Sequence, residues 1–572
     1  MKHLKRLSAL FIAAAMLLSL AACSEKTPTP SDTQSNVPES TGNTIATRAS
    51  ETAPPATEDL SARYGGHANI RSATMMTKVD PLKKTGLWAY QFQTCVFENA
   101  LTRDTNNNIQ PAVCDYELSD DTLTLKLWVR DGIKFSNGDT VDIYDVEASI
   151  TRSFTMFGSM KTKVYPYLES MEVGADGKTL TLKFTEYQEN TLYYLAAYQT
   201  WCPIMPKEIC EKYPDTEIED IADLIGTGPY MYSEWNNPES VTLVRVPGYE
   251  PREADRDRTG FAGMKYAFLD SITFIGNQND GSAALAVLNG DYDVVECIPS
   301  EYYQLALASG LKETILPSNV GCMTYFNVDN SKDESGNYVN VCAKYPSLRK
   351  AIMAAIDYEA YLTVVTDNQQ VMGGSPWQSP LYQNDLWTSA DYYGPTKLDV
   401  AAKYVAQAKA EGWNGEEPVQ IVYSNKRTDI PTLFQDYMAK AGIPSVVTLM
   451  EDSAYSEYTA AGSGNNYDIL FVWPTYSFTP TLQPSYFTAR WSENETKNAL
   501  LEQMKTLPTD SAEYIRLARE YDELLIDECG AAYMSMINWY WYSPQELEFN
   551  DQGLVRYFFN SYWDDPENHP MK

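Results

Sequence analysis

Residues 467–480, which read Y-D-I-L-F-V-W-P-T-Y-S-F-T-P, combine a short apolar run with a proline and an aromatic loop. The apolar run, Ile469 to Trp473, is typical of a strand buried on both faces, and such strands belong to parallel sheets covered by helices. Pro474 cannot donate to a sheet ladder, so we expect the strand to end before it. Because ligands in open α/β sheets bind outside the carboxyl ends of strands, the loop that follows is a predicted wall of a ligand site.

The segments before this strand alternate between strand and helix patterns. Residues 419–423 and 446–449 are predicted strands. The segment between them predicts a helix that begins at Pro431 and stops at Gly442, and a short helix is expected over 455–461. Strand, helix, strand, helix, strand is the order of a parallel sheet with right-handed crossovers.

The amino-terminal part of the chain contains a different pattern. Residues 122–129 alternate apolar and polar side chains, which predicts a strand with one buried face. Asp142 is the predicted N-cap of the helix that follows. Asp176-Gly177 separates two further strand patterns and predicts a hairpin, and residues 203–213 predict a helix begun by a proline.

Residues 1–22 are a predicted signal peptide. Lys2 and Arg6 lie in a positively charged start, and the apolar stretch 7–20 is too short to span a membrane. The stretch ends in Leu-Ala-Ala-Cys, which resembles the lipobox of bacterial lipoproteins, whose cysteine, here Cys23, is lipidated after cleavage. The alternative is an ordinary cleaved signal in which Cys23 has no role.

Residues 23–63 are the predicted lipidated cysteine and flexible linker. The segment is rich in Ser, Thr, Pro and Glu and has almost no large apolar residues, so it cannot bury enough surface to fold. As a flexible chain its ends would lie about 35 Å apart. No later stretch reaches the ~18 apolar residues of a spanning helix. We therefore expect a bacterial protein anchored to the cell membrane by lipid and facing outside the cytoplasm.

The overall composition narrows the classes of function. A formal net charge of −33 argues against a nucleic-acid partner, which needs basic patches. The 41 tyrosines and 12 tryptophans suit wet binding surfaces, because each side chain joins an apolar body to a polar group. Of the nine cysteines, those beyond Cys23 are scattered along the chain, and the pattern assigns no disulfide pairing.

Catalytic and metal-binding motifs are missing from the sequence. The three histidines, His3, His67 and His569, cannot form a zinc site of the H-E-x-x-H type. G-x-S-x-G, Walker A and G-x-G-x-x-G motifs do not occur either. We therefore expect no catalytic residue, no metal site and no cofactor. The 77 acidic residues leave chance carboxylate pairs, so an exported glycan hydrolase is the rival enzyme hypothesis.

Several ordered blocks along the chain point to a family. They are Val96-Phe97-Glu98-Asn99-Ala100-Leu101, Ile109-Gln110-Pro111, Val129 to Gly138, Gly226-Thr227-Gly228-Pro229-Tyr230 and Leu348-Arg349-Lys350-Ala351-Ile352. In this order they resemble the family 5 extracellular solute-binding proteins, which are the oligopeptide, dipeptide and nickel receptors of ABC importers. The resemblance covers about residues 64–557, and several ordered blocks are far more specific than a single motif.

The resemblance implies an α/β fold of the two-lobe periplasmic-binding-protein type. Both lobes would contain parallel sheets, and the first lobe would carry an additional inserted α+β domain. Residues 64–98, 222–320 and 531–572 would form lobe I. Residues 99–221 would be the inserted domain, and residues 321–530 would form lobe II.

The same resemblance implies the function. It predicts a substrate-binding lipoprotein of an ABC transporter, not an enzyme, that captures a peptide or peptide-like solute between its lobes and delivers it to the permease subunits. We expect a monomer that is held to the membrane by its lipid. A non-peptide solute such as a saccharide is the first alternative. A surface adhesin is another, although the sequence has none of the repeats typical of one.

The aromatic loop departs from the pattern of the family's peptide receptors. In those receptors W-x-x-D is followed by D-P, and the first Asp binds the terminal ammonium group of the peptide. Here Trp473 and Pro480 match, but Tyr476 and Thr479 stand at the two acid positions. A buried ammonium group needs a carboxylate, because an unpaired buried charge costs several kcal/mol. Either another acid binds the ammonium group, or the ligand has none, as in a blocked peptide or a saccharide.

The predicted ligand-binding residues lie in this loop and in two neighbouring segments. In chain order they are Tyr325, Asn327, Arg427, Trp473, Thr475, Tyr476 and Phe478. The aromatic faces of the loop suit sugars, apolar side chains or a cation. Some dipeptide receptors of the family place an Arg in the loop of Arg427, where its fork would bind a ligand carboxylate at two points, the alternative being a solvated surface residue. Tyr325 and Asn327 resemble the family's strand that crosses into lobe II.

Overall fold

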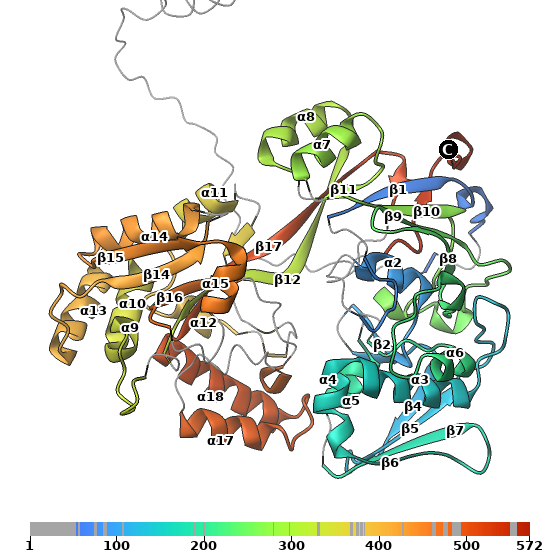
Figure 1. Ribbon diagram of the computed structural model, residues 1–572, viewed down its shortest axis with the longest axis horizontal. Coiled ribbons are helices and arrows are strands. Elements are labelled where there is room, and N and C mark those ends of the chain that lie inside the picture. Colours follow the sequence, from blue (N-terminus) through green and yellow to red (C-terminus); the bar gives the residue numbers. More distant parts are fainter. Residues whose placement is uncertain are drawn as a thin grey trace, which may run out of the picture. The chain divides into compact units, whose positions relative to one another are not determined.

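The structure is a computed structural model that describes most of the chain after residue 57. The described residues are 53–54, 58–73, 77–83, 89–105, 108–186, 189–197, 201–277, 279–296, 298–328, 332–366, 370–372, 377, 381–382, 384–425, 428–459, 465–472, 479–482, 494–549 and 557–571. Helices and strands carry the labels of Figure 1.

The largest sheet within the described residues, called the large sheet below, has seven strands. They are β11 (Val295–Glu296), β12 (Lys312–Phe326), β13 (Gln370–Met372), β14 (Val419–Ser424), β15 (Ser445–Met450), β16 (Ile469–Val472) and β17 (Ala531–Ser543). Their order is β11-β17-β12-β16-β14-β15, with β13 also on β17. β14 is parallel to β15 and β16, whereas β12 is antiparallel to β16 and β17.

Strand β16 is buried on both faces, as predicted. Ile469 and Phe471 pack into one hydrophobic cluster, and Leu470 packs into another on the opposite face. The first cluster is covered by α9 (Val341–Lys344), α10 (Pro346–Ala355), α11 (Tyr358–Thr366), α13 (Leu398–Glu411) and α14 (Asp429–Lys440). The second is covered by α12 (Leu386–Ser389), α17 (Glu495–Met504) and α18 (Ala512–Glu528). Figure 1 shows α17 and α18 side by side and apart from α10, α13 and α14.

The predicted alternation of strands and helices around β14 is confirmed, with earlier helix starts. β14, α14, β15, α15 (Asp452–Tyr458) and β16 follow one another. α14 begins at Asp429 rather than at Pro431, because buried Ile430 also belongs to the core and a proline is tolerated in the first turn. α15 begins at Asp452 rather than at residue 455, since acidic residues suit a first helical turn. The sheet is mixed rather than wholly parallel, because β12 lies antiparallel beside β16.

A second sheet, called the β1 sheet below, has four strands among the described residues. They are β1 (His67–Ser72), β8 (Tyr230–Asn236), β9 (Ser240–Arg245) and β10 (Ser271–Gly276), in the order β1-β10-β9-β8. β1 and β10 are parallel, and the other pairs are antiparallel. Helix α2 (Ala89–Val96) is buried against this sheet, and helices α7 (Asp280–Leu288) and α8 (Tyr303–Ala308) pack beside β11. A parallel bridge between Ile70 and Val294 connects β1 to the start of β11.

Residues 114–184 form a third, antiparallel sheet with helices against it. Its strands are β4 (Cys114–Leu118), β5 (Thr124–Val129), β6 (Leu168–Val173) and β7 (Thr179–Phe184), in the order β4-β5-β7-β6. β5 has the predicted buried face, and the Asp176-Gly177 hairpin joins β6 to β7. Asp142 caps α3 (Ile143–Met156) through a capping box, as predicted. The helix predicted over 203–213 is shorter, since α6 runs from Lys207 to Lys212 with Pro206 as N-cap.

The remaining elements are short. They are α4 (Gly158–Lys163), α5 (Glu189–Leu195), β2 (Leu101–Arg103), β3 (Ile109–Pro111), β18 (Leu547–Glu548) and β19 (Tyr562–Trp563). None of the helices in the described part of the chain is both long enough and apolar enough to cross a membrane.

Candidate functional site

The carboxyl ends of β14 and β16 meet at one edge of the large sheet. The two strands are parallel neighbours, so Ser424 and Val472 end them at the same edge. The loops that leave this edge contain most of the predicted ligand-binding residues. Arg427, Trp473, Thr475, Tyr476 and Phe478 all lie outside the described residues, so their role stays a prediction.

The base of the aromatic loop is held by three ring systems. The ring of Tyr423 at the end of β14 packs edge-on against Phe471 of β16, with centroids 5.3 Å apart. Tyr455 of α15 packs edge-on against Tyr423 at 5.7 Å and donates its hydroxyl to the Phe471 carbonyl at 2.9 Å. Because edge-to-face aromatic pairs are favourable and the hydroxyl is satisfied, the strand end that carries the loop is rigidly supported.

The far end of the same loop is anchored to α18. Thr479, which stands at the second acid position of the family pattern, is buried, and its hydroxyl lies 3.1 Å from the hydroxyl of Thr481. Thr481 in turn lies 2.6 Å from the hydroxyl of Tyr514 on α18. The described residues on either side of 473–478 are therefore both held by the protein body, one by ring packing at the end of β16 and the other by hydroxyl contacts to α18.

Tyr325 and Asn327 lie at the opposite end of β16. Tyr325 pairs with Leu470 in the sheet register and is fully buried in the cluster under α18. Asn327 donates its backbone N–H to the Asp468 carbonyl at 2.9 Å and its side-chain amide to the Tyr467 carbonyl at 3.0 Å. Since β12 runs antiparallel to β16, the structure places Asn327 at the amino end of β16 and does not bring it to the strand end where the loop begins.

Asp468 organises that amino end. One carboxylate oxygen accepts from the backbone N–H of Cys342 and the other from that of Gln420, each at 2.8 Å. Burial raises the pKa of Asp468 to about 6, and these backbone donors only partly oppose the effect. The carboxylate thereby joins α9, β14 and the start of β16 through backbone donors of the protein itself.

The corresponding edge of the β1 sheet contains a buried arginine that the sequence analysis did not single out. Arg71 in β1 is 1 % exposed and donates to the carbonyls of Asn277 and Glu296 at 2.9 and 3.1 Å. It also forms an ion pair with Asp280, whose side chain is 55 % exposed. Arg71 thereby ties together the carboxyl ends of the parallel strands β1, β10 and β11. No clear signal for it was present in the sequence, because the strand His67–Ser72 already alternates polar and apolar residues and Arg71 continues its polar positions.

Two of the ordered sequence blocks meet in a buried ion cluster. Glu98 accepts from Arg252 at 2.5 and 3.0 Å, from Lys265, and from the hydroxyl of Thr227 at 2.9 Å. Burial alone raises the pKa of Glu98, but the two cations outweigh it and hold the pKa well below its usual range. Asp255, with its own arginines Arg130, Arg252 and Arg258, continues the cluster.

Gly226 and Gly228 allow the backbone before β8 to pack directly against the end of α2. A Cβ atom on Gly228 would lie 2.5 Å from the Cys95 carbonyl oxygen, and one on Gly226 would overlap the Val96 carbonyl. Only glycine lets the two backbones approach this closely. The cluster is a packing junction between α2 and the turn before β8.

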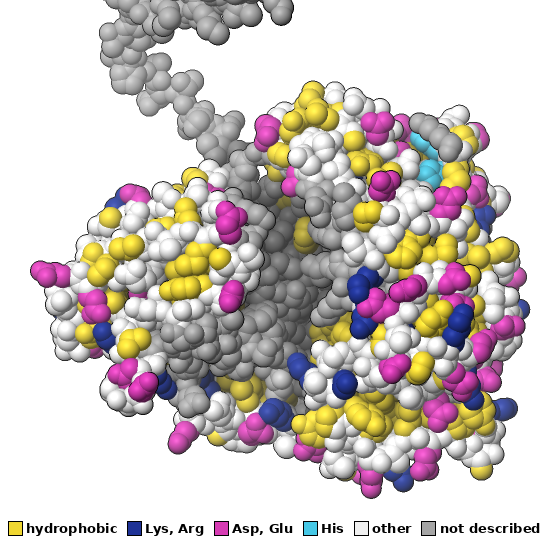
Figure 2. Space-filling model, in the orientation of Figure 1, with side chains coloured by type: hydrophobic (Ala, Val, Ile, Leu, Met, Phe, Trp, Pro, Cys, Tyr) yellow, Lys and Arg dark blue, Asp and Glu magenta, His cyan; other side chains and the backbone are white. Residues whose placement is uncertain are grey.

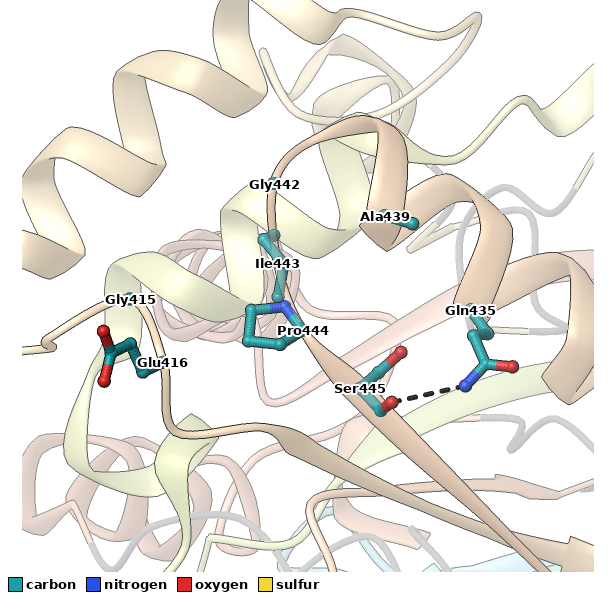
Figure 3. A pocket seen from close by; sticks show the side chains of 8 residues that line it. All are labelled: Gly415, Glu416, Gln435, Ala439, Gly442, Ile443, Pro444 and Ser445. Atoms are coloured by element: carbon teal, nitrogen blue, oxygen red, sulfur yellow. Dashed lines mark hydrogen bonds between the residues drawn. The ribbon is translucent and has the colours of Figure 1, made fainter.

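Figure 3 shows an open hollow at the far end of the large sheet. It has a volume of about 690 Å³ and is lined by Gly415, Glu416, Gln435, Ala439, Gly442, Ile443, Pro444 and Ser445. Gln435 of α14 donates to the Ser445 carbonyl at 3.3 Å across it. The hollow lies at the amino end of β15, so it is not at the strand edge where the predicted loop begins.

The remaining groups that could take part in chemistry are metal-ligand side chains, cysteine thiols and surface carboxylates. No group of three or more His, Cys, Asp and Glu side chains suited to a metal ion occurs within the described residues. Cys95, Cys114, Cys202, Cys210, Cys342 and Cys529 are buried free thiols, and burial raises the pKa of Cys95 to about 12. Figure 2 shows acidic side chains scattered over the visible face rather than gathered in one patch.

A family model described as bacterial extracellular solute-binding proteins, family 5 middle, matches residues 108–498. The chain belongs to this family. The match covers more than half of the chain and includes the sheet of β5 and the strands β14 to β16. Family 5 proteins are solute-binding receptors, and the resemblance inferred from the ordered blocks is confirmed.

Curated relatives of this family 5 protein are distant. Protein XP55 of Streptomyces lividans is 23 % identical over 331 residues, which cover 56 % of this chain and 52 % of that protein. The glutathione-binding protein GsiB of Salmonella paratyphi A is 24 % identical over 293 residues, which cover 50 % of this chain and 51 % of GsiB. The chain thus spans about half the length of these curated relatives.

Solved structures confirm the fold class. The ABC transporter substrate-binding protein CtaP from Listeria monocytogenes superposes with a TM-score of 0.72 at 18 % identity, covering 88 % of this chain and all of CtaP. At this identity the similarity establishes the fold and not the ligand. The family 5 chain has the two-lobe, α/β periplasmic-binding-protein fold expected from its sequence.

Proposed function

We propose that this family 5 protein is an extracytoplasmic receptor of an ABC importer that captures a peptide-like solute between its lobes and delivers it to a permease. The family match over residues 108–498 carries the proposal. The two lobes would close on the solute, with polar groups fixing its orientation and aromatic rings supplying contact area. Binding and release alone perform this task, so no covalent step is required.

The ligand site of the proposal is the edge where β14 and β16 end. Residues 473–478 leave this edge from a rigid base, and ligands of α/β folds bind at such edges. Trp473, Tyr476 and Phe478 would form the aromatic wall, and Thr475 and Arg427 would supply polar contacts. Within the proposal Tyr325 and Asn327 support β16 from its amino end, since Tyr325 pairs with Leu470 and Asn327 donates to the Tyr467 carbonyl.

A peptide-like solute is favoured by the relatives and the family resemblance. GsiB is named for glutathione, which is a small peptide. Residues 64–98, 222–320 and 531–572 as lobe I, 99–221 as inserted domain and 321–530 as lobe II complete the proposed architecture. The separate antiparallel sheet of β5 within 99–221 supports this division.

A solute without a free amine is the second candidate. No acid stands between Asp468 and Glu493 in the sequence, so the loop lacks the carboxylate that binds a peptide ammonium group in peptide receptors of the family. A blocked peptide or a saccharide would fit aromatic faces without needing an ion pair.

The cellular placement is also part of the proposal. Cys23 would carry the lipid, residues 24–63 would be the linker, and the receptor would work as a monomer outside the cytoplasm. The lipobox-like sequence before Cys23 supports this placement. Labelling cells with a radioactive fatty acid tests it, because a Cys23→Ser variant should lose the label and remain in the precursor form.

Native mass spectrometry of the purified protein, before and after denaturation, tests the receptor role. We expect a small solute to leave only on denaturation and to be recovered chemically unchanged. Turnover of a glycan by the same preparation would instead support the hydrolase hypothesis.

Replacing Tyr476 with alanine tests the proposed wall. The Tyr476→Ala variant should bind the recovered solute at least tenfold more weakly, because a ring face is lost, while its melting temperature without ligand stays the same. Calorimetric titration measures both proteins, and Tyr165→Ala, which truncates an exposed ring outside the proposed site, is the matched control. An unchanged affinity would remove Tyr476 from the site.

Free-amine peptides test the missing carboxylate. Di- and tripeptides with free amines should raise the melting temperature only weakly, whereas N-acetylated versions should raise it more. Thermal unfolding at matched ligand concentrations gives the comparison. A large upshift with the free amines would show that a carboxylate elsewhere binds the ammonium group.

A further inference from the structure

The side chain of Gln91 in α2 is buried without hydrogen bonds. Gln91 is 2 % exposed, and neither its amide nitrogen nor its amide oxygen has a hydrogen-bond partner in the structure as described. Proteins rarely leave a buried amide unpaired, because it loses its hydrogen bonds to water and gains nothing in return. Two adjacent unpaired atoms on one side chain indicate that something absent from the chain itself pairs with them.

The position of Gln91 is at the binding edge of the β1 sheet. The carboxyl-terminal end of α2 packs against Gly228, just before the start of β8, so it lies at the amino edge of the parallel strands. β8 runs in the same direction as β1, since β8, β9 and β10 alternate and β10 is parallel to β1. The first turn of α2, which contains Gln91, therefore lies toward the carboxyl edge, where α/β folds bind ligands. Helical side chains also lean toward the helix start.

The neighbours of Gln91 on the helix are occupied. Tyr90 accepts a hydrogen bond from the indole nitrogen of Trp201 at 3.1 Å. Phe92 packs against Phe274 and Tyr232 of the β1 sheet. One turn later on the face of Gln91, the thiol of Cys95 lies against the backbone of Phe558. Gln91 is thus fixed in place by packed neighbours and leaves a donor and an acceptor together.

A peptide group matches this donor and acceptor. The N–H and C=O of one residue in an extended chain point to the same side, as they do in an antiparallel sheet pair. The carboxamide of Gln91 can donate from its nitrogen to that C=O and accept at its oxygen from that N–H. Extended peptides are commonly bound through their main chain in this way.

We propose that Gln91 is a ligand-binding residue that pairs through its side-chain amide with the main-chain N–H and C=O of one residue of a bound peptide-like solute. This inference rests on the receptor function proposed above and assigns a contact on lobe I to complement the aromatic loop of lobe II. The pairing reads the backbone, so it is independent of the peptide's side chains and of its terminal amine.

The test compares Gln91→Met with Tyr232→Phe. Methionine keeps the length of the side chain without its amide. Tyr232 in β8 supplies the matched control, because its buried hydroxyl also has no hydrogen-bond partner within the described residues, yet it packs on the sheet side of α2. Calorimetric titration uses N-acetyl-trialanine amide and a set of depsipeptide analogues in which one N–H at a time is replaced by an ester oxygen.

We expect Gln91→Met to weaken binding of N-acetyl-trialanine amide at least tenfold, with an unchanged or higher melting temperature in the absence of ligand. Tyr232→Phe should leave the affinity unchanged. One of the depsipeptides should bind the natural protein at least fivefold more weakly than the peptide, and this difference should disappear in Gln91→Met.

Three results overturn the inference, and they are distinguishable from failure of the receptor proposal. Equal peptide affinity of the natural protein and Gln91→Met refutes the role of Gln91 and leaves the receptor intact. Equal affinity with a lowered melting temperature shows that a buried water pairs with Gln91 for structural reasons. If the natural protein binds none of the peptides while a different solute co-purifies with it, the peptide class fails, and this inference fails with it.

Discussion

Glu98, which follows α2, and Asp468, which precedes β16, are both buried carboxylates, but their pKa values are shifted in opposite directions. Glu98 is surrounded by Arg252, Lys265 and Thr227, and its pKa is held well below the usual range. Asp468 accepts from two backbone N–H groups, and its pKa rises to about 6. Burial penalises both charges, so the difference lies in the partners. Full positive charges stabilise a carboxylate more than backbone dipoles do.

The comparison predicts how each region responds to loss of its acid. Loss of the Glu98 charge leaves two buried cations without their main partner, whereas loss of one Asp468 oxygen leaves a single backbone N–H group without an acceptor. The Glu98 substitution should therefore lower the free energy of unfolding more than the Asp468 substitution. The contributions of the two carboxylates to stability should also change with pH in opposite directions.

The largest effect is expected for Glu98→Gln. Removing the charge leaves Lys265 and Arg252 buried without their main partner, and breaking a buried ion pair in this way costs about 3–5 kcal/mol. Chemical denaturation followed by circular dichroism measures the free energy of unfolding. The control is Glu513→Gln, which removes one partner of an exposed ion pair with Arg516 and should leave stability nearly unchanged, because water and salt screen the pair. Equal small effects at both sites would mean that the Glu98 cluster is open to water.

A smaller loss is expected for Asp468→Asn. An asparagine has one oxygen, so it can accept from Cys342 or from Gln420 but not from both, and the orphaned N–H costs about 1–3 kcal/mol. The free energy of unfolding by denaturant gives the value. Asp333→Asn is the exposed control, because one oxygen of Asp333 accepts from two backbone N–H groups, so asparagine can keep both bonds in a turn open to water. A loss at Asp333 as large as at Asp468 would contradict the argument from burial.

The smallest effect is a change in the slope of stability with pH. The pKa of Asp468 is about 6 in the folded protein and about 4 in the unfolded chain, so between these values the folded state holds a proton that the unfolded state has lost. The stability contributed by Asp468 therefore falls as pH rises from about 4 to about 6. Above about pH 6 it is lost.

Comparison with Asp468→Asn isolates this slope. The natural protein should gain about 1–2 kcal/mol over the variant on going from pH 7 to pH 4.5. Taking the difference cancels the contribution of Asp522, whose pKa burial raises to about 7. Glu98 has the opposite sign, because its stabilisation is complete above about pH 4 and declines only in stronger acid. A difference between the proteins that shrinks on acidification would show that Asp468 is ionised throughout.

Much of the fold could be predicted because its signals are local. The apolar run at Ile469 and the alternation around β5 record burial within a few residues, and both predictions are confirmed. Helix starts were less predictable, since Pro431 gives a strong local signal whereas the burial of Ile430 is a tertiary fact. The mixed strand directions of the large sheet could not be predicted either, because β12 and β16 are far apart in the sequence and local patterns do not show that they pair.

The candidate site could be predicted only in part. The strand that carries the aromatic loop is where the sequence placed it, but the loop itself lies outside the described residues. Arg71 and Glu98 were not recognised as organising residues, because their partners are distant in the sequence. Lys265 is 167 positions from Glu98, and no periodic pattern connects them.

The contact of Thr227 with Glu98, beneath the two crowded glycines Gly226 and Gly228, has a consequence for how such chains are classified. In this chain the motifs that carry the family resemblance hold the scaffold together, since they touch each other within the protein body. Substitutions in the loops at the strand ends can then change ligand specificity without altering these motifs. Membership of this family therefore indicates the receptor scaffold, whereas the ligand is determined by other residues.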